Sequence, residues 1–402
     1  MQQFSSDIKQ SFVEEYKSIL RFWQQYSVDN ENGGFYGEVD RKGRPVPDAP
    51  KGAVLNTRIL WTFSSAYNFL KDEAYLELAH RAYRYLINNF WDKENGGILW
   101  SLNPKGEPLD SRKQIYAQGF AIYGLSEYYK ATGNKESLRY AIKLFELIEK
   151  WAFDPRHGGY LEALSNDWGL MADMRLSAKD ANEPKSMNTH LHIIEPYTNL
   201  YRVWPDEKLA LQITRLIEVF ITKIIDPQTA HFNLFFDMDW KVKSNMVSYG
   251  HDIEGTWLLC EAASVIGDKQ LVEKVNEAAL RMSEATLREG CAPDGSIYYE
   301  NHPSTNYLEE ERHWWVQAEG MLGFMNSWQL SGEKHYLEAA ERLWNYIEKN
   351  FIDKEYGEWY LRIDLKGRAV LSDPKAGFWK CPYHNTRALM EMYQRITNSK
   401  IS

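Results

Sequence analysis

The chain has 402 residues, a formal net charge of −9, 44% hydrophobic residues and 26% charged residues. This composition excludes a disordered chain, and the acidic balance argues against nucleic acid or an anionic membrane surface as a partner. The 15 Trp and 25 Tyr residues suit either a large helical core or a carbohydrate site.

The first predicted element is an amphipathic helix over residues 5–25, where apolar residues recur at helical spacing among charged ones. That pattern differs from the apolar core of a signal peptide, and no apolar run reaches the length of a membrane span. Cys260, Cys291 and Cys381 are far apart and form no CxxC pair, which favours neither a disulfide framework nor a structural zinc site. We expect a cytoplasmic protein.

One type of segment then recurs along the chain: an acidic residue, a turn in which glycine is frequent, and a short aromatic-rich alternation. Its copies follow at intervals of roughly 60–70 residues, and begin at Asp29, Asp92, Asp154, Asp226, Asp294 and Asp353. Glycines permit a tight turn and the alternation suits paired strands, so each copy predicts a short β-hairpin or extended loop. The spacing leaves room for two helices between successive copies.

Two kinds of helix follow each hairpin. The first is apolar on nearly all sides, over 54–70, 115–130, 187–203, 251–265, 315–330 and 384–396. The second, seen at 136–150 and 334–349, carries one apolar stripe with charges opposite. A helix that is apolar all round is buried, whereas one with a single stripe faces solvent. The first helices therefore form an inner ring and the second an outer ring.

The predicted fold is an all-α, twelve-helix (α/α)6 barrel with short β-hairpins at one mouth, formed by a single domain over residues 1–402. The alternative is an open solenoid of helix pairs, but neither end helix resembles the polar cap that a solenoid needs. The longest irregular stretch, about 164–185, is expected to be a lid or rim loop.

Polar residues gather in the first turns of the inner helices, at the same mouth as the hairpins. In chain order they are Asn56, Arg58, Tyr116, Gln118, Asn188, His190, His192, His251, Asp252, Glu254, Trp315, Gln317, Glu319, His384, Asn385 and Arg387. We expect them to converge on one pocket, lined also by Trp257 and Trp379. A single buried histidine is usually a hydrogen-bonded core residue, but several with polar partners at one mouth indicate a functional site.

Metal and nucleotide chemistry find little support in the sequence. His190 and His192 are two positions apart, so a helix sends them to different faces, and no HExxH or spaced acidic cluster is present. The chain also lacks a GxGxxG, a Walker sequence and a GxSxG elbow. We predict no cofactor and no catalytic metal.

Six motifs carry a family resemblance. They are LNTRILW (55–61), IYAQGFAIYGLSEYY (115–129), NTHLHIIE (188–195), SYGHDIEGTW (248–257), HWWVQAEG (313–320) and WKCPYHNTR (379–387). Together they cover essentially the whole chain, and the chain resembles the cellobiose 2-epimerases of the N-acylglucosamine 2-epimerase superfamily. The resemblance implies reversible epimerisation at C2 of the reducing-end sugar of β-1,4 disaccharides such as cellobiose and lactose, without cofactor or metal.

The resemblance also implies roles for particular residues. His251 and His384 would be the acid/base pair, and His192 would assist ring opening. Arg58 and Asn188 would hold the open-chain oxygens, while Glu254 and Glu319 would orient or polarise the site. Trp315 and Trp379 would stack on the sugar, and Tyr116 and Trp257 would line the pocket. These roles suit the chemistry, because inverting C2 means removing a proton next to a carbonyl and returning one to the opposite face. Imidazole, with an ordinary pKa near 6.5, can do either at neutral pH.

Three alternatives stay open. Another member of the superfamily would act on N-acylglucosamine or mannose, and Trp379 favours the disaccharide interpretation over that one. An inverting glycoside hydrolase would use Glu254 and Glu319 as its carboxylate pair, but would leave the histidines unexplained. The third is a glycan-binding barrel without activity. The expected partner is a small-molecule disaccharide, and the expected state is a monomer or weak homodimer.

Overall fold

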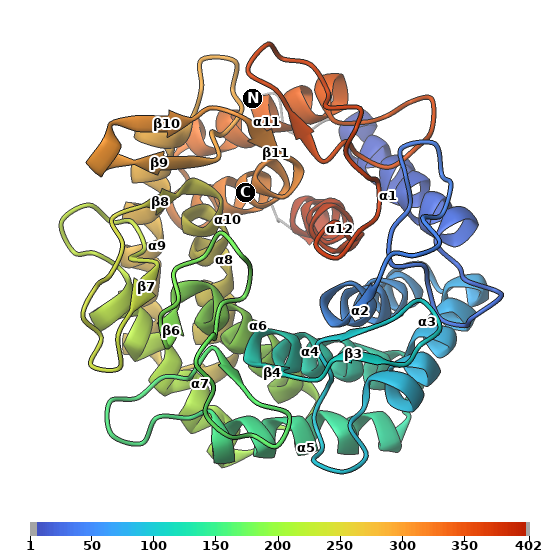
Figure 1. Cartoon of the computed structure of the whole chain (residues 1–402). Helices are drawn as coiled ribbons and strands as arrows, with labels where there is room; N and C mark the ends of the chain where they lie inside the picture. Colours follow the sequence, from blue (N-terminus) through green and yellow to red (C-terminus); the bar gives the residue numbers. More distant parts are fainter. Residues whose placement is uncertain (1–5, 399–402) are drawn as a thin grey trace.

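The computed structural model describes residues 6–398, which contain twelve α-helices in two concentric rings (Figure 1). The inner ring consists of α2 (Ala53–Leu70), α4 (Ile115–Thr132), α6 (Met187–Val203), α8 (Tyr249–Ile266), α10 (Trp314–Ser331) and α12 (Tyr383–Asn398). The outer ring consists of α1 (Ser6–Tyr26), α3 (Glu73–Tyr85), α5 (Lys135–Trp151), α7 (Glu207–Val219), α9 (Lys269–Ala285) and α11 (Lys334–Asn350). The predicted (α/α)6 barrel is confirmed.

The ring is closed between its first and last repeats. Helix α12 packs against α10 and α2 in the inner ring and against α1 in the outer ring. At the rim, the Val39 N–H donates a hydrogen bond to the Ala376 carbonyl at 3.0 Å. These contacts exclude the open solenoid.

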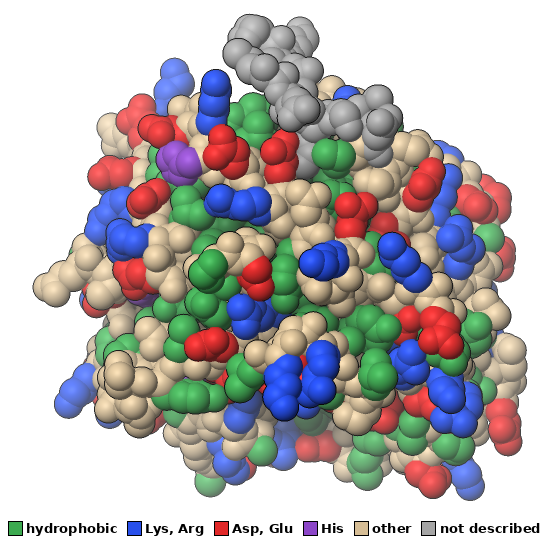
Figure 2. Space-filling model, turned by 90° about the horizontal axis from the view of Figure 1, so that it is seen from above, with side chains coloured by type: hydrophobic (Ala, Val, Ile, Leu, Met, Phe, Trp, Pro, Cys, Tyr) green, Lys and Arg blue, Asp and Glu red, His purple; other side chains and the backbone are tan. Residues whose placement is uncertain are grey.

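Burial separates the two rings as the apolar patterns predict. In α4 every residue from Ile115 to Tyr128 is buried, whereas α5 buries only the stripe that faces α4 and its neighbours. Acidic and basic side chains are interspersed on the outer face seen in Figure 2, without a continuous basic patch. No helix within residues 6–398 is long and apolar enough to cross a membrane.

Tight turns join each inner helix to its outer partner. Several inner helices end in the left-handed conformation that glycine adopts readily, at Gly133, Gly267 and Gly332. Outer helices then begin at side chains that accept hydrogen bonds from the first-turn N–H groups, namely Asp72, Asn134, Asp206 and Asp268. Because successive helices run in opposite directions, the tight turns lie at one end of the barrel. The longer hairpin loops all lie at the other end, which forms the mouth.

Short antiparallel strands join neighbouring repeats at this mouth. The two-residue strand before an inner helix pairs with the strand after the next hairpin turn, as β1 with β2, β4 with β5, β6 with β7, β8 with β9 and β11 with β12. Strand β3 extends β2, and β10 extends β9. The hairpin turns themselves are closed by single bridges such as Val28–Phe35 and Trp91–Ile98. The predicted hairpins exist, but most strand pairs lie between repeats rather than within them.

The remaining elements have the following bounds. The strands are β1 (Lys51–Gly52), β2 (Ser101–Leu102), β3 (Pro108–Asp110), β4 (Lys113–Gln114), β5 (Ala163–Leu164), β6 (Lys185–Ser186), β7 (Phe235–Phe236), β8 (Val247–Ser248), β9 (Glu300–His302), β10 (Tyr307–Glu309), β11 (Arg312–His313) and β12 (Arg362–Ile363). Single π-helical turns end three outer helices, at η1 (Leu86–Phe90), η2 (Phe220–Ile224) and η3 (Thr286–Gly290), and one 3₁₀ turn is η4 (Pro303–Thr305).

The aspartate that opens a repeat anchors its hairpin to the next inner helix. The Asp92 carboxylate accepts hydrogen bonds from the N–H groups of Glu94 and Asn95 and from Lys113 Nζ at 2.7 Å. Burial alone would raise the pKa of Asp92, but Lys113 and the turn N–H groups outweigh it and lower this pKa. Lys113 is fully buried directly before α4, so the ion pair sets where that helix enters the mouth. Equivalent pairs join Asp29 to Lys51, Asp154 to Lys185 and Asp353 to Lys375.

Candidate active site

A cavity of about 430 Å³ opens at the mouth where the inner helices begin. Nine residues expected to form the site line it, namely Arg58, Tyr116, Asn188, His192, His251, Glu254, Trp315, Trp379 and His384. The irregular stretch before β6 contributes Leu176, Ser177, Lys179 and Asp180, as expected of a rim loop.

Other polar residues in the same helical turns do not line the cavity, which corrects the expectation that all converge on it. His190 Nε2 accepts a hydrogen bond from the Tyr160 N–H at 2.9 Å, and Gln118 bonds both the N–H and the carbonyl of Ile98. Both thereby hold a hairpin in place. Besides Glu319, the residues that do not line the cavity are Asn56, Gln118, His190, Asp252, Gln317, Asn385 and Arg387. Residues two apart on a helix point in nearly opposite directions, whereas residues three or four apart share a face. Asn188 and His192 therefore reach the cavity and His190 does not.

Trp257 and Glu319 lie behind the wall of the cavity, which is a second correction. Trp257 is 1% exposed and Glu319 is fully buried. The Trp257 indole N–H donates to Glu319 Oε2 at 3.0 Å, and Glu319 Oε1 lies 2.7 Å from His384 Nδ1. Both residues therefore support a histidine instead of lining the pocket.

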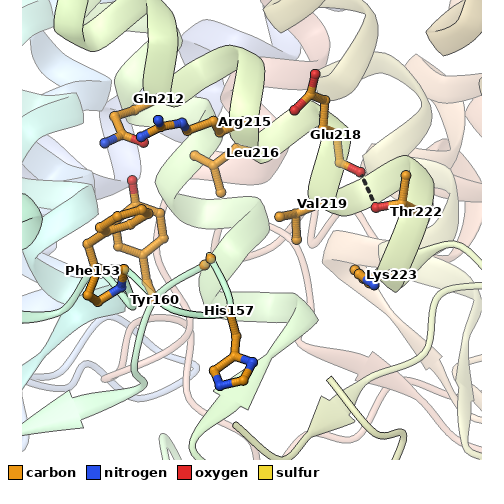
Figure 3. A pocket seen from close by; sticks show the side chains of 13 residues that line it. Phe153, His157, Tyr160, Gln212, Arg215, Leu216, Glu218, Val219, Thr222 and Lys223 are labelled. Carbon is orange, nitrogen blue, oxygen red and sulfur yellow. Dashed lines mark hydrogen bonds between the residues drawn. The ribbon is translucent and has the colours of Figure 1, made fainter. Parts of the chain in front are cut away.

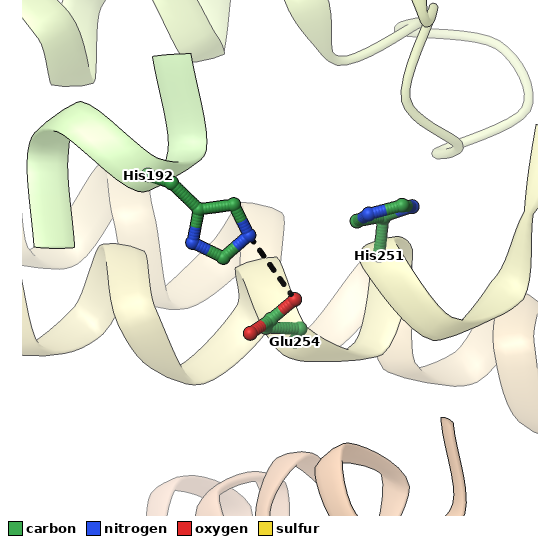
Figure 4. Close-up of side chains that lie close together, drawn as sticks. All are labelled: His192, His251 and Glu254. Atoms are coloured by element: carbon green, nitrogen blue, oxygen red, sulfur yellow. Dashed lines mark ion pairs between the residues drawn. The ribbon is translucent and has the colours of Figure 1, made fainter. Parts of the chain in front are cut away.

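Each of the three predicted histidines in the cavity has a partner on Nδ1, so Nε2 is left for the cavity. The partner is a carboxylate for two rings and a hydroxyl for the third: Glu195 for His192 at 2.9 Å, Glu319 for His384 at 2.7 Å and Ser248 for His251 at 2.7 Å. Such a partner fixes the orientation and tautomer of the ring. Glu254, expected to do this, instead lies 3.9 Å from His192 Nε2 (Figure 4).

Sequence reasoning assigned no role to Glu195 or Ser248. Both could have been found, because each lies three positions from its histidine and three-residue spacing brings side chains together on one helical face. It also missed Tyr299, His302 and His313, which line the cavity from the fifth repeat. Short strands and loops carry these residues, and no helical period marks them.

Burial keeps the three histidines neutral. It lowers the pKa of His192, and it lowers the pKa values of His251 and His384 well below the ordinary 6.5. Neighbouring positive charge acts in the same direction on His384, through Arg58 and Arg387. A neutral imidazole can accept a proton, so all three rings can serve as bases at neutral pH.

A buried guanidinium beneath the cavity holds three carboxylates. Arg387 Nη2 donates to Glu254 Oε1 at 3.0 Å and to Glu319 Oε1 at 2.6 Å, and Nη1 contacts Glu195. Burial would raise the pKa of Glu195, but Arg387 and His192 lower it to about 2. Burial and mutual repulsion raise the pKa values of Glu254 and Glu319. The network thus contains one firmly ionised carboxylate, Glu195, and two carboxylates, Glu254 and Glu319, whose raised pKa values favour their protonated forms.

Three polar atoms at the cavity have no hydrogen-bond partner among residues 6–398. They are Arg58 Nε, Asn188 Oδ1 and Glu254 Oε2. Arg58 is otherwise held by the Tyr116 hydroxyl at 2.7 Å, and its guanidinium lies 4.1 Å from the ring centre of Phe120. Buried polar atoms are normally paired, so these positions suit the oxygens of a polar ligand.

The course of α6 explains how His192 reaches the cavity. Pro196 lies inside this helix, and His192 has the non-helical angles φ −94° and ψ 16°. Proline lacks an N–H to bond the carbonyl four residues earlier and its ring crowds that carbonyl, which belongs to His192. Gly119 of α4 lies against this carbonyl, and a Cβ at position 119 would come within 2.4 Å of it. The kink and the glycine together let α4 approach α6 beside the histidine.

Residues 34–388 match the N-acylglucosamine 2-epimerase (GlcNAc 2-epimerase) family. The chain belongs to this family. It is 50% identical to the cellobiose 2-epimerase of Bacteroides fragilis over 386 residues, which cover 96% of this chain and 98% of that protein. The structure of cellobiose 2-epimerase from Bacillus thermoamylovorans matches with a TM-score of 0.92 and 39% identity, over 97% of this chain and 100% of the other. D-mannose isomerase of Marinomonas mediterranea is 22% identical over 409 residues, covering 96% of this chain and 98% of that protein.

As a member of the N-acylglucosamine 2-epimerase family, the chain is a carbohydrate epimerase. The cavity fits that activity in its shape and its polar groups. Trp315 lies between two of the histidines, with ring centres 4.7 Å from His251 and 5.7 Å from His384. Trp379 borders the other side, 5.9 Å from Tyr116. Flat rings beside several hydrogen-bonding groups suit a sugar, which has apolar faces and polar edges.

A second cavity, of about 570 Å³, lies outside the barrel between the hairpin at 153–160 and α7 (Figure 3). Equivalent hairpins pack their glycines against Tyr85 or Leu147 of the next outer helix, but a Cβ added to Gly158 would meet no other part of the chain within 4 Å. Helix α7 has the smaller Val219 at its end, where α3 has Tyr85. This cavity contains none of the expected site residues, and a small side chain accounts for it.

Proposed function

We propose that the protein reversibly epimerises C2 of the reducing-end sugar of β-1,4 disaccharides, converting cellobiose to glucosyl-mannose and lactose to epilactose. One observation carries the proposal: three neutral histidines share one cavity, and each has Nδ1 held so that Nε2 is free for proton transfer. Epimerisation next to a carbonyl needs bases on both sides of one carbon, and this arrangement supplies them.

The reaction begins with ring opening, in which His192 transfers protons at the ring and anomeric oxygens and so exposes the aldehyde. One of His251 and His384 then removes the C2 proton. The electron pair of the C–H bond forms the C1–C2 double bond, and the carbonyl π pair moves to O1. The other ring, which is neutral at rest, takes up a proton from solvent and delivers it to the opposite face of C2, and the carbonyl re-forms. The first ring then releases its proton to solvent, so both imidazoles are neutral again.

Charge and shape support the intermediate. Arg58 is buried beside the cavity and burial does not neutralise it, since its pKa is raised above the ordinary value for arginine. Its positive charge would stabilise the negative charge that develops on O1, and Asn188 would hold a neighbouring oxygen. Trp315 lies against both proposed acid/base rings and would keep water from the enediolate.

The disaccharide specificity is supported by the relatives named cellobiose 2-epimerase, which are 33% to 50% identical to this chain. Trp379 at the cavity wall offers a stacking surface for a second sugar ring. A monosaccharide epimerase or mannose isomerase is the nearest alternative, because the same enediolate gives a ketose when the proton returns to C1. Inverting hydrolysis is less well supported, because Glu319 does not line the cavity and is bonded to Arg387 together with Glu254.

NMR of cellobiose with the protein in heavy water tests the proposal. We expect glucosyl-mannose with deuterium at C2 and no cleavage of the glycosidic bond. Free glucose would instead establish hydrolysis. Inert cellobiose together with turnover of free mannose or N-acylglucosamine would show that the substrate is a monosaccharide.

A further inference from the structure

Two of the cavity histidines and one carboxylate form a compact group of potential metal ligands. His192, His251 and Glu254 each offer one ligand atom, and these atoms all lie within 4.8 Å of one another. His192 Nε2 and Glu254 Oε2 are 3.9 Å apart, and the three side chains point toward a common space (Figure 4). The sequence argument against a metal concerned His190 and His192, whereas the fold pairs His192 with His251 of another helix.

The unpaired oxygen of Glu254 is a second, independent observation. Glu254 is fully buried and Oε1 is bonded to Arg387, but Oε2 has no hydrogen-bond partner among residues 6–398. A buried carboxylate oxygen without a donor is costly in free energy. A cation between Glu254 and the two imidazoles would remove that cost.

The partners behind the histidines match those of metal sites. A metal-bound histidine usually has its other ring nitrogen hydrogen-bonded to a carboxylate or another oxygen, which orients the ring. His192 has Glu195 at 2.9 Å and His251 has Ser248 at 2.7 Å, both on Nδ1. The hydrogen bonds that would orient both histidines of a two-histidine, one-carboxylate metal site are therefore already in place.

The distances also suit a first-row metal. Zinc binds nitrogen and oxygen ligands at about 2.0–2.1 Å, so tetrahedral ligand atoms are roughly 3.4 Å apart. The 3.9 Å between His192 Nε2 and Glu254 Oε2 needs an approach of about half an ångström. The two pairs that include His251 lie within 4.8 Å and need an approach of at most about 1.4 Å. Two imidazoles and one carboxylate form a ligand set that zinc prefers, with a fourth position open toward the cavity.

We propose that His192, His251 and Glu254 form a binding site for Zn²⁺, and that zinc bound there inhibits the enzyme in competition with the sugar. Zinc would occupy the Nε2 atoms that proton transfer requires. The inhibition rests on the proposed function, but the binding of the metal does not.

Cobalt titration of the metal-free protein tests the binding directly, without any sugar. We expect one Co²⁺ per chain with the visible absorption of a four- or five-coordinate ion, and displacement by Zn²⁺. X-ray absorption of the zinc-loaded wild-type protein should show two imidazole ligands with bonds of about 2.0–2.1 Å. Absence of the cobalt bands, or a zinc shell without histidine, would overturn the site.

Variants locate the metal. His192→Gln, His251→Gln and Glu254→Gln should each weaken Zn²⁺ binding by more than about 100-fold, because loss of a ligand exceeds the 10- to 100-fold cost of losing an outer partner. His302→Gln is the matched control, since His302 lines the same cavity outside the group, and it should bind zinc normally. Loss of binding in His384→Gln with retention in His192→Gln would move the metal to the other grouping, Glu254, Glu319 and His384, and refute the proposal.

Steady-state kinetics distinguishes the proposed zinc site from the proposed epimerase activity. Zn²⁺ should raise the apparent KM for cellobiose with kcat unchanged, and a chelator should reverse the effect. Inhibition that lowers kcat alone would refute competition at this site. If the protein binds zinc through His192 and His251 but turns over no sugar, the proposed function fails and the metal site stands.

Discussion

His190 and His192 lie two residues apart on the same helix, both are buried, and they belong to different parts of the molecule. His192 faces the cavity with Glu195 behind it, whereas His190 faces outward and accepts the Tyr160 N–H. The same alternation holds for Tyr116 and Gln118 on α4. The inner face of the ring thus carries the candidate chemistry, and the face toward the hairpins carries structural hydrogen bonds.

Loss of a cavity histidine should have the largest effect on catalysis. We expect His251→Gln and His384→Gln each to lower kcat for cellobiose by about 10²–10⁴-fold, the usual contribution of a general acid or base. The melting temperature should stay close to that of the wild type, because glutamine has nearly the volume of histidine and also carries a hydrogen-bonding group. Near-normal kcat in either variant would break the proposed division between the two faces.

Loss of a histidine's partner should have the next largest effect, and its size should depend on charge. Glu319→Gln should lower kcat on the order of 10²-fold, because an amide can hold His384 in the wrong tautomer. Ser248→Ala removes a neutral hydrogen bond worth about 1 kcal/mol, which corresponds to a loss of about 5-fold. Steady-state kinetics of both variants, with melting curves as control, checks the order. An equal loss of kcat in the two variants would show that Glu319 acts only by orienting His384 and not through its charge.

His231, on the hairpin side, should make stability depend on alkaline pH. Burial opposes its charge, but ion pairs with Asp252 and Glu289 outweigh burial and raise its pKa to about 9. The stabilisation is present below the unfolded pKa of 6.5 and is lost as pH rises through 9, by up to about 3 kcal/mol. Urea unfolding of the wild type between pH 6.5 and 9.5 should show this loss, and His231→Gln should reduce it. The half-buried His335→Gln, whose ring lies beside Glu284 and Glu333, is the control.

His190→Leu should have the smallest effect, and it should act on stability alone. The variant leaves the Tyr160 N–H without its buried acceptor, which costs about 1–2 kcal/mol. Denaturant unfolding should show this change while kcat per folded molecule stays near the wild-type value. A loss of kcat as large as that in His251→Gln, with the fold intact, would place His190 in the active site.

The sequence determined the architecture and most of the site. Hairpin motifs at regular spacing and two kinds of helical pattern are local properties, so the twelve-helix barrel and its mouth could be predicted from them. The catalytic motifs lie at equivalent positions of different repeats, and nine of the expected residues line one cavity. Their proposed roles stay predictions until the variants are measured.

Only the tertiary structure decided which contacts these residues make. Helical spacing says that two residues share a face, but not where that face points, so His190 and Gln118 could not be separated from the cavity residues. Trp257 and Glu319 lie one turn too deep to reach the cavity, and the packing of α8, α10 and α12 alone brings Glu319 to His384. Contacts between repeats depend on how helices pack in three dimensions, and a one-dimensional pattern does not contain that information.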